Sequence, residues 1–172
     1  PKANNINLQT GGDVIHVPKS GTSVVYLPLV HRMSLLQCEG DDEYLPSLIT
    51  YNDQNDYIHV PLIRKEWLAS IKEQLKINDT PESGVILGFG QEQDFEIYLG
   101  GVENFSAENL VYFDSSGQIL RQSHGVNGGG FILFNAPKGL NSVVAVPVGK
   151  QKIYTQLIPV DDLSVAIVNF RL

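Results

Sequence analysis

The chain has 172 residues and a formal net charge of −7, from 12 lysines and arginines against 19 aspartates and glutamates. Nucleic acids and anionic membrane surfaces are bound through clustered basic residues, so this charge balance argues against both as partners. Hydrophobic residues make up 42% of the chain, which is enough to form a core and argues against a disordered chain. No run of 18 apolar residues occurs, so the sequence predicts no membrane-spanning helix.

The first 80 residues predict a small α+β part. Apolar runs bounded by turn residues predict strands at 14–18, 23–30 and 57–63, and Pro28 restricts its strand to an edge or a bulge. Residues 5–8 predict a short strand or arm, and residues 33–38 predict either the next strand or a bent extension of the run at 23–30. Residues 45–51 have mixed spacing that predicts no element type.

One amphipathic helix is predicted at the end of this part. Trp67, Leu68, Ile71 and Leu75 form a single apolar stripe at helical spacing, so we expect Trp67 to be largely buried. Asn78 and Asp79 are expected to end the helix, which makes residues 79–83 the best boundary in the chain.

The remaining residues predict a β-sandwich. Seven β-rich runs, at 85–89, 95–99, 110–113, 131–134, 142–148, 153–158 and 163–170, are separated by Gly, Asn, Asp, Ser and Pro at the spacing typical of sandwiches. The predicted fold is therefore mainly β. A C-terminal antiparallel β-sandwich, residues 84–172, follows a small α+β part with one helix, residues 1–80. We expect the sandwich to fold on its own.

The run at 131–134 is apolar on both faces, because Phe131 and Leu133 alternate with Ile132 and Phe134. This pattern predicts a central strand that is covered on both sides. We expect Gly139 to turn the chain into 143–146 as its antiparallel neighbour, with Pro137 outside the ladder.

Three stretches of the C-terminal part resemble one known family. The segment opens on Gly-Val-Ile-Leu-Gly-Phe-Gly at 84–90 and carries Asp-Ser-Ser-Gly at 114–117. It then has Gly-Gly-Phe-Ile-Leu-Phe-Asn-Ala-Pro-Lys-Gly at 129–139, before the valine-rich 143–146. The pattern resembles the carboxypeptidase regulatory-like domain, a transthyretin-like β-sandwich, although the middle is longer and Gly90 stands where that family often has Val. The resemblance covers about 84–172 and implies a non-catalytic accessory module, often of exported or envelope proteins.

The histidines and the cysteine offer little chemistry. His16, His31, His59 and His124 have no metal-ligand spacing, although His16 and His59 lie in near-identical runs and would form a site if they were paired on neighbouring strands. Otherwise they are ordinary strand residues. Cys38 excludes an internal disulfide, and its apolar neighbours favour a small buried side chain over a reactive thiol.

Other candidate motifs are incomplete. Ser115, Ser116 and the pair Ser123-His124 lie in turn-like stretches without the Gly-x-Ser-x-Gly pattern of hydrolases, so any Ser/His/Asp set would have to assemble from distant positions. The glycines at 88–90 and 128–130 lack the Lys and the helix of a phosphate-binding loop. The acidic loops 39–43 and 53–56 lack calcium-loop spacing. Residues 78–80 and 104–106 match the N-glycosylation pattern.

The expected function is a non-catalytic binding or structural module of an exported or cell-envelope protein, periplasmic or extracellular, with a protein or polysaccharide partner. Two alternatives stay open: a small hydrolase whose site assembles only in three dimensions, and a subunit of a surface assembly that pairs through exposed strand edges. No catalytic, cofactor-binding or metal-binding residue is predicted, and no cofactor is expected.

Overall fold

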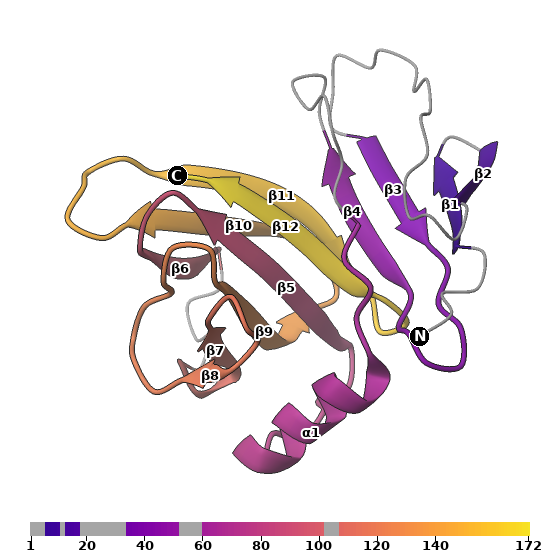
Figure 1. Ribbon diagram of the computed structural model, residues 1–172, viewed down its shortest axis with the longest axis horizontal. Coiled ribbons are helices and arrows are strands. Elements are labelled where there is room, and N and C mark those ends of the chain that lie inside the picture. The colour runs from indigo at the N-terminus through magenta and orange to yellow at the C-terminus, as the bar shows by residue number, and fades with distance from the viewer. Residues whose placement is uncertain (1–5, 11–12, 18–33, 52–59, 102–106) are drawn as a thin grey trace. The chain divides into compact units, whose positions relative to one another are not determined.

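The computed structural model describes residues 6–10, 13–17, 34–51, 60–101 and 107–172 (Figure 1). The chain divides into two compact units, Pro1–Leu75 and Lys76–Leu172. That residues 84–172 fold alone stays a prediction.

The first unit contains a small antiparallel sheet. Its strands lie in the order β2-β1-β3-β4 and comprise β1 (Ile6–Thr10), β2 (Asp13–Val17), β3 (Ser34–Cys38) and β4 (Ser47–Tyr51). The sequence predicts β1, β2 and β3, whereas β4 falls in the stretch without a predicted type. The run expected at 23–30 lies outside the described residues. The strand expected at 57–63 is wrong for its described part, because residues 60–63 have no regular structure.

The predicted helix is present as α1 (Lys65–Leu75). Its buried side chains are Leu68 and Ile71, and Leu75 is exposed. Trp67 has intermediate burial, so most of its surface is covered, as expected. The helix ends earlier than expected. Lys76 has a φ of 56°, a left-handed conformation that stops the helix before Asn78 and Asp79.

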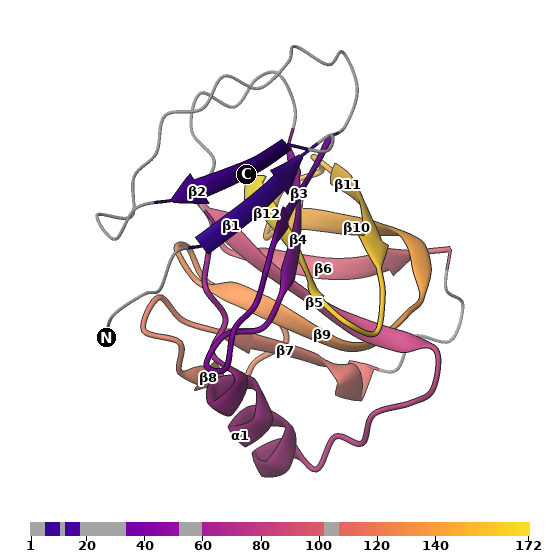
Figure 2. The same cartoon turned by 90° about the vertical axis from the view of Figure 1, so that its right-hand side faces the viewer.

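The second unit contains two layers of strands (Figure 2). In one layer the strands follow the order β12-β5-β9-β7-β8, and in the other the order β11-β10-β6. The bounds in chain order are β5 (Ser83–Gln91), β6 (Phe95–Gly100), the short 3-10 helix η1 (Ala107–Asn109), β7 (Leu110–Phe113), β8 (Ile119–Leu120), β9 (Gly130–Pro137), β10 (Gly139–Pro147), β11 (Tyr154–Val160) and β12 (Val165–Arg171).

The mainly β class with one α-helix is confirmed, and each of the seven predicted C-terminal runs overlaps an observed strand. The expectation of an antiparallel sandwich needs one correction, because β12 pairs with β5 in parallel. β12 enters this layer from β11 of the other layer, so no hairpin fixes its direction relative to β5.

The expected hairpin between β9 and β10 is wrong. β9 pairs with β5 and β7, whereas β10 pairs with β6 and β11 in the other layer. The chain therefore changes sheets between Pro137 and Gly139, and Gly139 has a φ of 111° that a residue with a side chain rarely adopts. The buried Asn141 amide supports this corner by donating to the carbonyl oxygens of Pro137 and Gly139. Pro137 is the last residue of β9 and lies opposite Ser83, so it is not outside the ladder.

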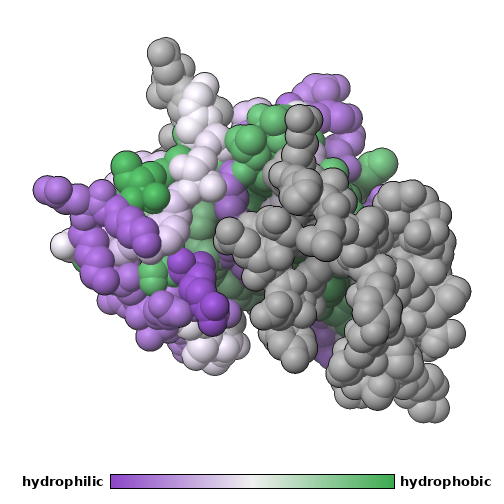
Figure 3. Space-filling model, turned by 90° about the horizontal axis from the view of Figure 1, so that it is seen from above, coloured by the Kyte–Doolittle hydropathy of each residue, from purple (hydrophilic) through white to green (hydrophobic). Residues whose placement is uncertain are grey.

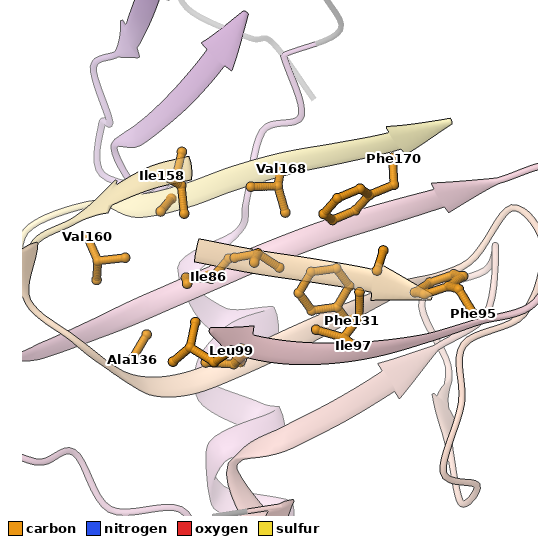
Figure 4. Close-up of a cluster of buried hydrophobic side chains, with 14 of the residues drawn as sticks. Ile86, Phe95, Ile97, Leu99, Phe131, Ala136, Ile158, Val160, Val168 and Phe170 are labelled. Atoms are coloured by element: carbon orange, nitrogen blue, oxygen red, sulfur yellow. The ribbon is translucent and has the colours of Figure 1, made fainter. Parts of the chain in front are cut away.

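The core of this unit fills the space between the two layers. Side chains from both sheets point toward one another there, among them Ile86 and Phe131 from one layer and Ile97, Leu99 and Ile158 from the other (Figure 4). β9 is a central strand between β5 and β7, and Phe131, Ile132, Leu133 and Phe134 are all fully buried. The prediction of a central strand covered on both faces is therefore confirmed.

Candidate functional site

The histidines of the described residues form no site. His16 lies in β2 opposite Asn7, and His124 lies in the segment between β8 and β9. His31 and His59 lie outside the described residues, so the pairing of His16 with His59 stays untested. In the part of the chain that the structure describes, no group of three or more His, Cys, Asp or Glu side chains could hold a metal ion.

Cys38 lies in β3 as a buried side chain. Burial raises the pKa of its thiol, and the side-chain hydrogen bond with Ser47 opposes this shift only in part. The sulfur donates weakly to the Glu39 carbonyl at 3.6 Å. A buried thiol with a raised pKa is a poor nucleophile, as the sequence favoured.

Ser116 is held in the tight turn between β7 and β8 rather than in a hydrolase site. Its hydroxyl donates to Asp114 Oδ1 at 2.6 Å, and the same oxygen accepts from the backbone amides of Ser116 and Gln118. These bonds, led by the one from the Ser116 hydroxyl, lower the pKa of Asp114. Among the described residues, no hydrogen bond joins a serine to a histidine, so a Ser/His pair is not assembled here.

The acidic loop 39–43 forms a turn at the start of α1. Asp41 Oδ1 accepts from the backbone amides of Glu43 and Tyr44, at 2.8 and 2.7 Å, and these bonds lower the pKa of Asp41. The Lys65 side chain donates to the Asp41 carbonyl oxygen, and Arg64 forms an ion pair with Glu43 at 3.4 Å. The carboxylate oxygen is thus engaged within the turn. The second acidic loop, 53–56, lies outside the described residues.

The glycine runs make room for aromatic rings. A Cβ atom on Gly88 would lie 2.0 Å from a carbon of the Phe131 ring, and one on Gly90 would lie 2.2 Å from the Phe95 ring. Gly130 stands in the same relation to Phe113, at 2.3 Å. Side chains at these positions are excluded by close ring packing, which explains the glycines without any phosphate ligand.

Asn135 organises a polar cluster within the second unit. It has a φ of 56° at a register shift between β5 and β9, a left-handed conformation that asparagine adopts more readily than most residues with a side chain. Its amide donates to the Asn78 carbonyl, and its side-chain oxygen accepts from the Thr80 amide at 3.0 Å. The bonds fix residues 78–80, one of the glycosylation patterns, against β9. The other pattern, 104–106, lies outside the described residues.

The strongest candidate site is the outer face of the three-stranded layer. In β10 the residues Asn141, Val143, Ala145 and Pro147 are buried, so the alternate residues point away from the core. The strand register places Val144 beside Tyr98 of β6 and Thr155 of β11, and places Ser142 beside Gly100 and Leu157. Side chains of three adjacent strands therefore share this outer face.

The outer face is unusually apolar for a surface. Three large side chains on its strands are exposed, with exposed fractions of 52% for Tyr98, 66% for Leu140 and 45% for Leu157. Two more, Val148 at 48% and Ile153 at 64%, lie in the connection between β10 and β11. Val144 and Val146 add partly exposed apolar surface between them. Hydrophobic groups are visible at the surface in the space-filling view, as green areas among the purple ones (Figure 3). We call these seven residues the apolar face.

One carboxylate borders the apolar face. Glu96 of β6 lies in register with Val146, and its Oε2 accepts a hydrogen bond from the Tyr98 hydroxyl at 2.6 Å. This bond raises the pKa of Tyr98, because the neutral phenol is its donor. The tyrosine ring is thereby held along the strand while about half of it stays in water.

The edge of the layer next to the apolar face is partly occupied by the chain itself. Phe95 of β6 exchanges two backbone hydrogen bonds with Gly125, at 3.0 and 2.7 Å. The Ile97 amide donates to the hydroxyl of the buried Tyr112 at 2.9 Å. Burial raises the pKa of Tyr112 to about 12. These groups take positions on β6 that an added strand would need.

Sequence reasoning missed the apolar face. The sequence does carry a signal for an apolar outer face. Apart from Asn141 and Ser142, residues 140–148 are apolar in both sets of alternate positions, the inward one and the outward one. Residues 131–134 carry the same signal, and there it marks a strand that is buried on both faces.

No family model, no curated protein and no solved structure matches this chain. The resemblance to the carboxypeptidase regulatory-like domain thus stays an expectation from the motifs. In the described part of the chain, no helix has both the length and the apolar character needed to cross a membrane.

Proposed function

We propose that this chain is a non-catalytic binding module and that the apolar face is its binding surface for a protein partner. The observation that carries the proposal is the exposure of Tyr98, Leu140 and Leu157 together on three adjacent strands. Soluble monomers seldom expose contiguous apolar patches of more than a few hundred Å², and such patches commonly bind partners.

A protein fits this surface better than a polysaccharide does. Tyr98 is the single aromatic side chain of the apolar face, whereas sugar rings need flat aromatic platforms and many hydrogen-bonding groups. The polar side chains that accompany the apolar face on the outer side of the layer are those of Glu96, Ser142 and Thr155. Aliphatic side chains that lose water on contact supply the main favourable term in protein association.

The two alternatives have weaker support. A hydrolase needs a nucleophile and a base within hydrogen-bond reach, and the described serines and His124 lack that arrangement. An assembly through strand pairing needs an open edge, and at the β6 edge the Phe95 and Ile97 positions are already engaged.

We further propose that the module belongs to an exported or cell-envelope protein, periplasmic or extracellular. Composition supports this, since Asn and Gln are frequent, lysine is scarce and the chain has 16 glycines. Cell fractionation of the native host with an antibody against this chain tests the location. Recovery of the protein from the cytosol alone would contradict it.

A library selection tests the binding role. A displayed library of random peptides is selected for binding to the full chain. The selected peptides are then tested for binding to two variants, Leu157→Glu and Leu163→Glu. Leu163 is a matched control, because it is 78% exposed but lies in the turn before β12 and outside the apolar face. We expect enriched binders that lose binding to the Leu157 variant and keep it with the Leu163 variant. The proposal would be contradicted if the selected peptides bind both variants as well as the original chain. It would also be contradicted if the selection gives no binding peptide.

A further inference from the structure

We propose that the apolar face takes an amphipathic α-helix of a partner protein, laid along β10. This inference rests on the proposed function and specifies the partner's chemistry. Four properties of the face carry it: its dimensions, its area, the Glu96 carboxylate and the engaged β6 edge.

The dimensions of the face match one helix. β10 has nine residues, and at about 3.3 Å per residue it spans about 30 Å. Three strands at about 4.8 Å spacing give a width of about 15 Å. An α-helix is about 10–12 Å wide and rises about 1.5 Å per residue, so a helix of about 20 residues covers the face in both directions.

The area of the face argues against a second copy of this chain. The dimensions above give a flat area of about 450 Å², whereas stable interfaces bury roughly 800 Å² on each partner. Two such faces stacked together fall short of that size. An amphipathic helix needs to bury only its one apolar stripe of side chains, and a face of this size is large enough to cover that stripe.

The charge and the edge define the helix further. Glu96 borders the face on the β6 side, and its second carboxylate oxygen has capacity to accept a bond beyond the one from Tyr98. A lysine or arginine on the flank of the helix that faces β6 would meet this carboxylate. An extended segment that added to β6 would meet Phe95 and the Ile97 amide, which are already bonded. The β6 edge therefore disfavours an added strand, whereas a helix laid on the face needs no free strand edge.

The test uses three labelled peptides of 20 residues and identical composition, rich in Leu, Ala, Gln and Lys. The first places Leu at helical spacing with Lys on one flank, the second alternates Leu with polar residues, and the third is scrambled. Fluorescence anisotropy is measured with the full chain, at peptide concentrations where each peptide is monomeric. We expect saturable binding of the helical peptide, at least tenfold tighter than binding of the other two.

Variants locate the binding. Leu157→Glu is expected to weaken binding of the helical peptide at least tenfold, and Glu96→Gln is expected to weaken it a few-fold. Leu163→Glu is expected to leave it unchanged. Circular dichroism of the two leucine variants confirms that each remains folded, so a loss of binding cannot be a loss of structure.

Three results would overturn the helix proposal while leaving the proposed function intact. The first is preferred binding of the alternating peptide. The second is failure of the helical peptide while library binders still depend on Leu157. The third is a dimer of the chain in analytical ultracentrifugation that the Leu157 variant abolishes. If no library binder depends on Leu157 either, the proposed function itself fails.

Discussion

The two layers of the unit Lys76–Leu172 share one core but differ in their other faces. In β9 both sets of alternating side chains are buried, with Phe131 and Leu133 on one face and Ile132 and Phe134 on the other. In β10 only one set is buried, and the other set leaves Leu140 and the valines in contact with water. Three of these four faces are buried, whereas the outer face of β10 is exposed. Our proposal assigns this exposed face to a protein partner.

The largest expected effect contrasts aromatic residues from the two layers. Phe131→Ala removes a fully buried ring that packs edge-on against Phe95, with ring centroids 6.3 Å apart. We expect a loss of about 3–5 kcal/mol in the free energy of unfolding. Tyr98→Ala, on the apolar face, is expected to change it by only about 0.5 kcal/mol. Urea unfolding of both variants measures the difference, and equal losses would show that the apolar face belongs to the core.

The second effect tests how closely the buried layer is packed. Gly88→Ala would drive a methyl group into the Phe131 ring, and we expect a loss of about 1–3 kcal/mol. Combining it with Phe131→Leu removes part of the obstructing ring. The double variant should then lose less stability than the two single variants together. Additive losses would mean that the ring is not what excludes a side chain at position 88.

The positions of these strands follow from the sequence, but their pairing does not. Alternating apolar residues bounded by Gly, Asn and Pro located all seven predicted C-terminal strands, because local burial sets that pattern. The two-residue β8 (Ile119–Leu120) is too short for any periodicity. The expected turn at Gly139 implied a hairpin between β9 and β10, yet the chain changes layers there. A short link between two strands is compatible with a change of layer as well as with a hairpin.

The site was less predictable than the fold. Residues 131–134 and 143–146 are both apolar at successive positions, and only the structure shows that the second run keeps one face in water. The close contacts of Gly88 with Phe131 and of Gly90 with Phe95 are likewise formed between strands that lie far apart in the sequence. Periodicity describes one strand at a time, whereas the exposure of a face depends on what packs against it.

The third prediction concerns Tyr112, whose hydroxyl bonds to the β6 edge. Its folded-state pKa, raised by burial to about 12, lies above the usual value of about 10. The stabilising contribution of the neutral phenol is therefore complete below pH 10 and is lost as the pH rises through 12. We expect the unfolding free energy to fall by about 2–3 kcal/mol over this window. Tyr112→Phe should remove that part of the pH dependence. An unchanged slope in the variant would contradict this role.

The smallest expected effect is that of Leu157→Glu, which is compared with a control substitution at its neighbour Ile158 on the opposite face of β11. Leu157 points outward on the apolar face, and Ile158 points inward and is fully buried. Leu157→Glu should change the unfolding free energy by about 0.5 kcal/mol at most, because the carboxylate stays in water. Ile158→Glu would place a charge in the core without a partner, and we expect the chain not to fold. Thermal unfolding followed by circular dichroism compares the two variants. If Leu157→Glu also unfolds the chain, Leu157 supports the fold, and the apolar face is then not a surface kept free for a partner. If it leaves the fold intact, Leu157 is not needed for folding, as the proposed binding role requires.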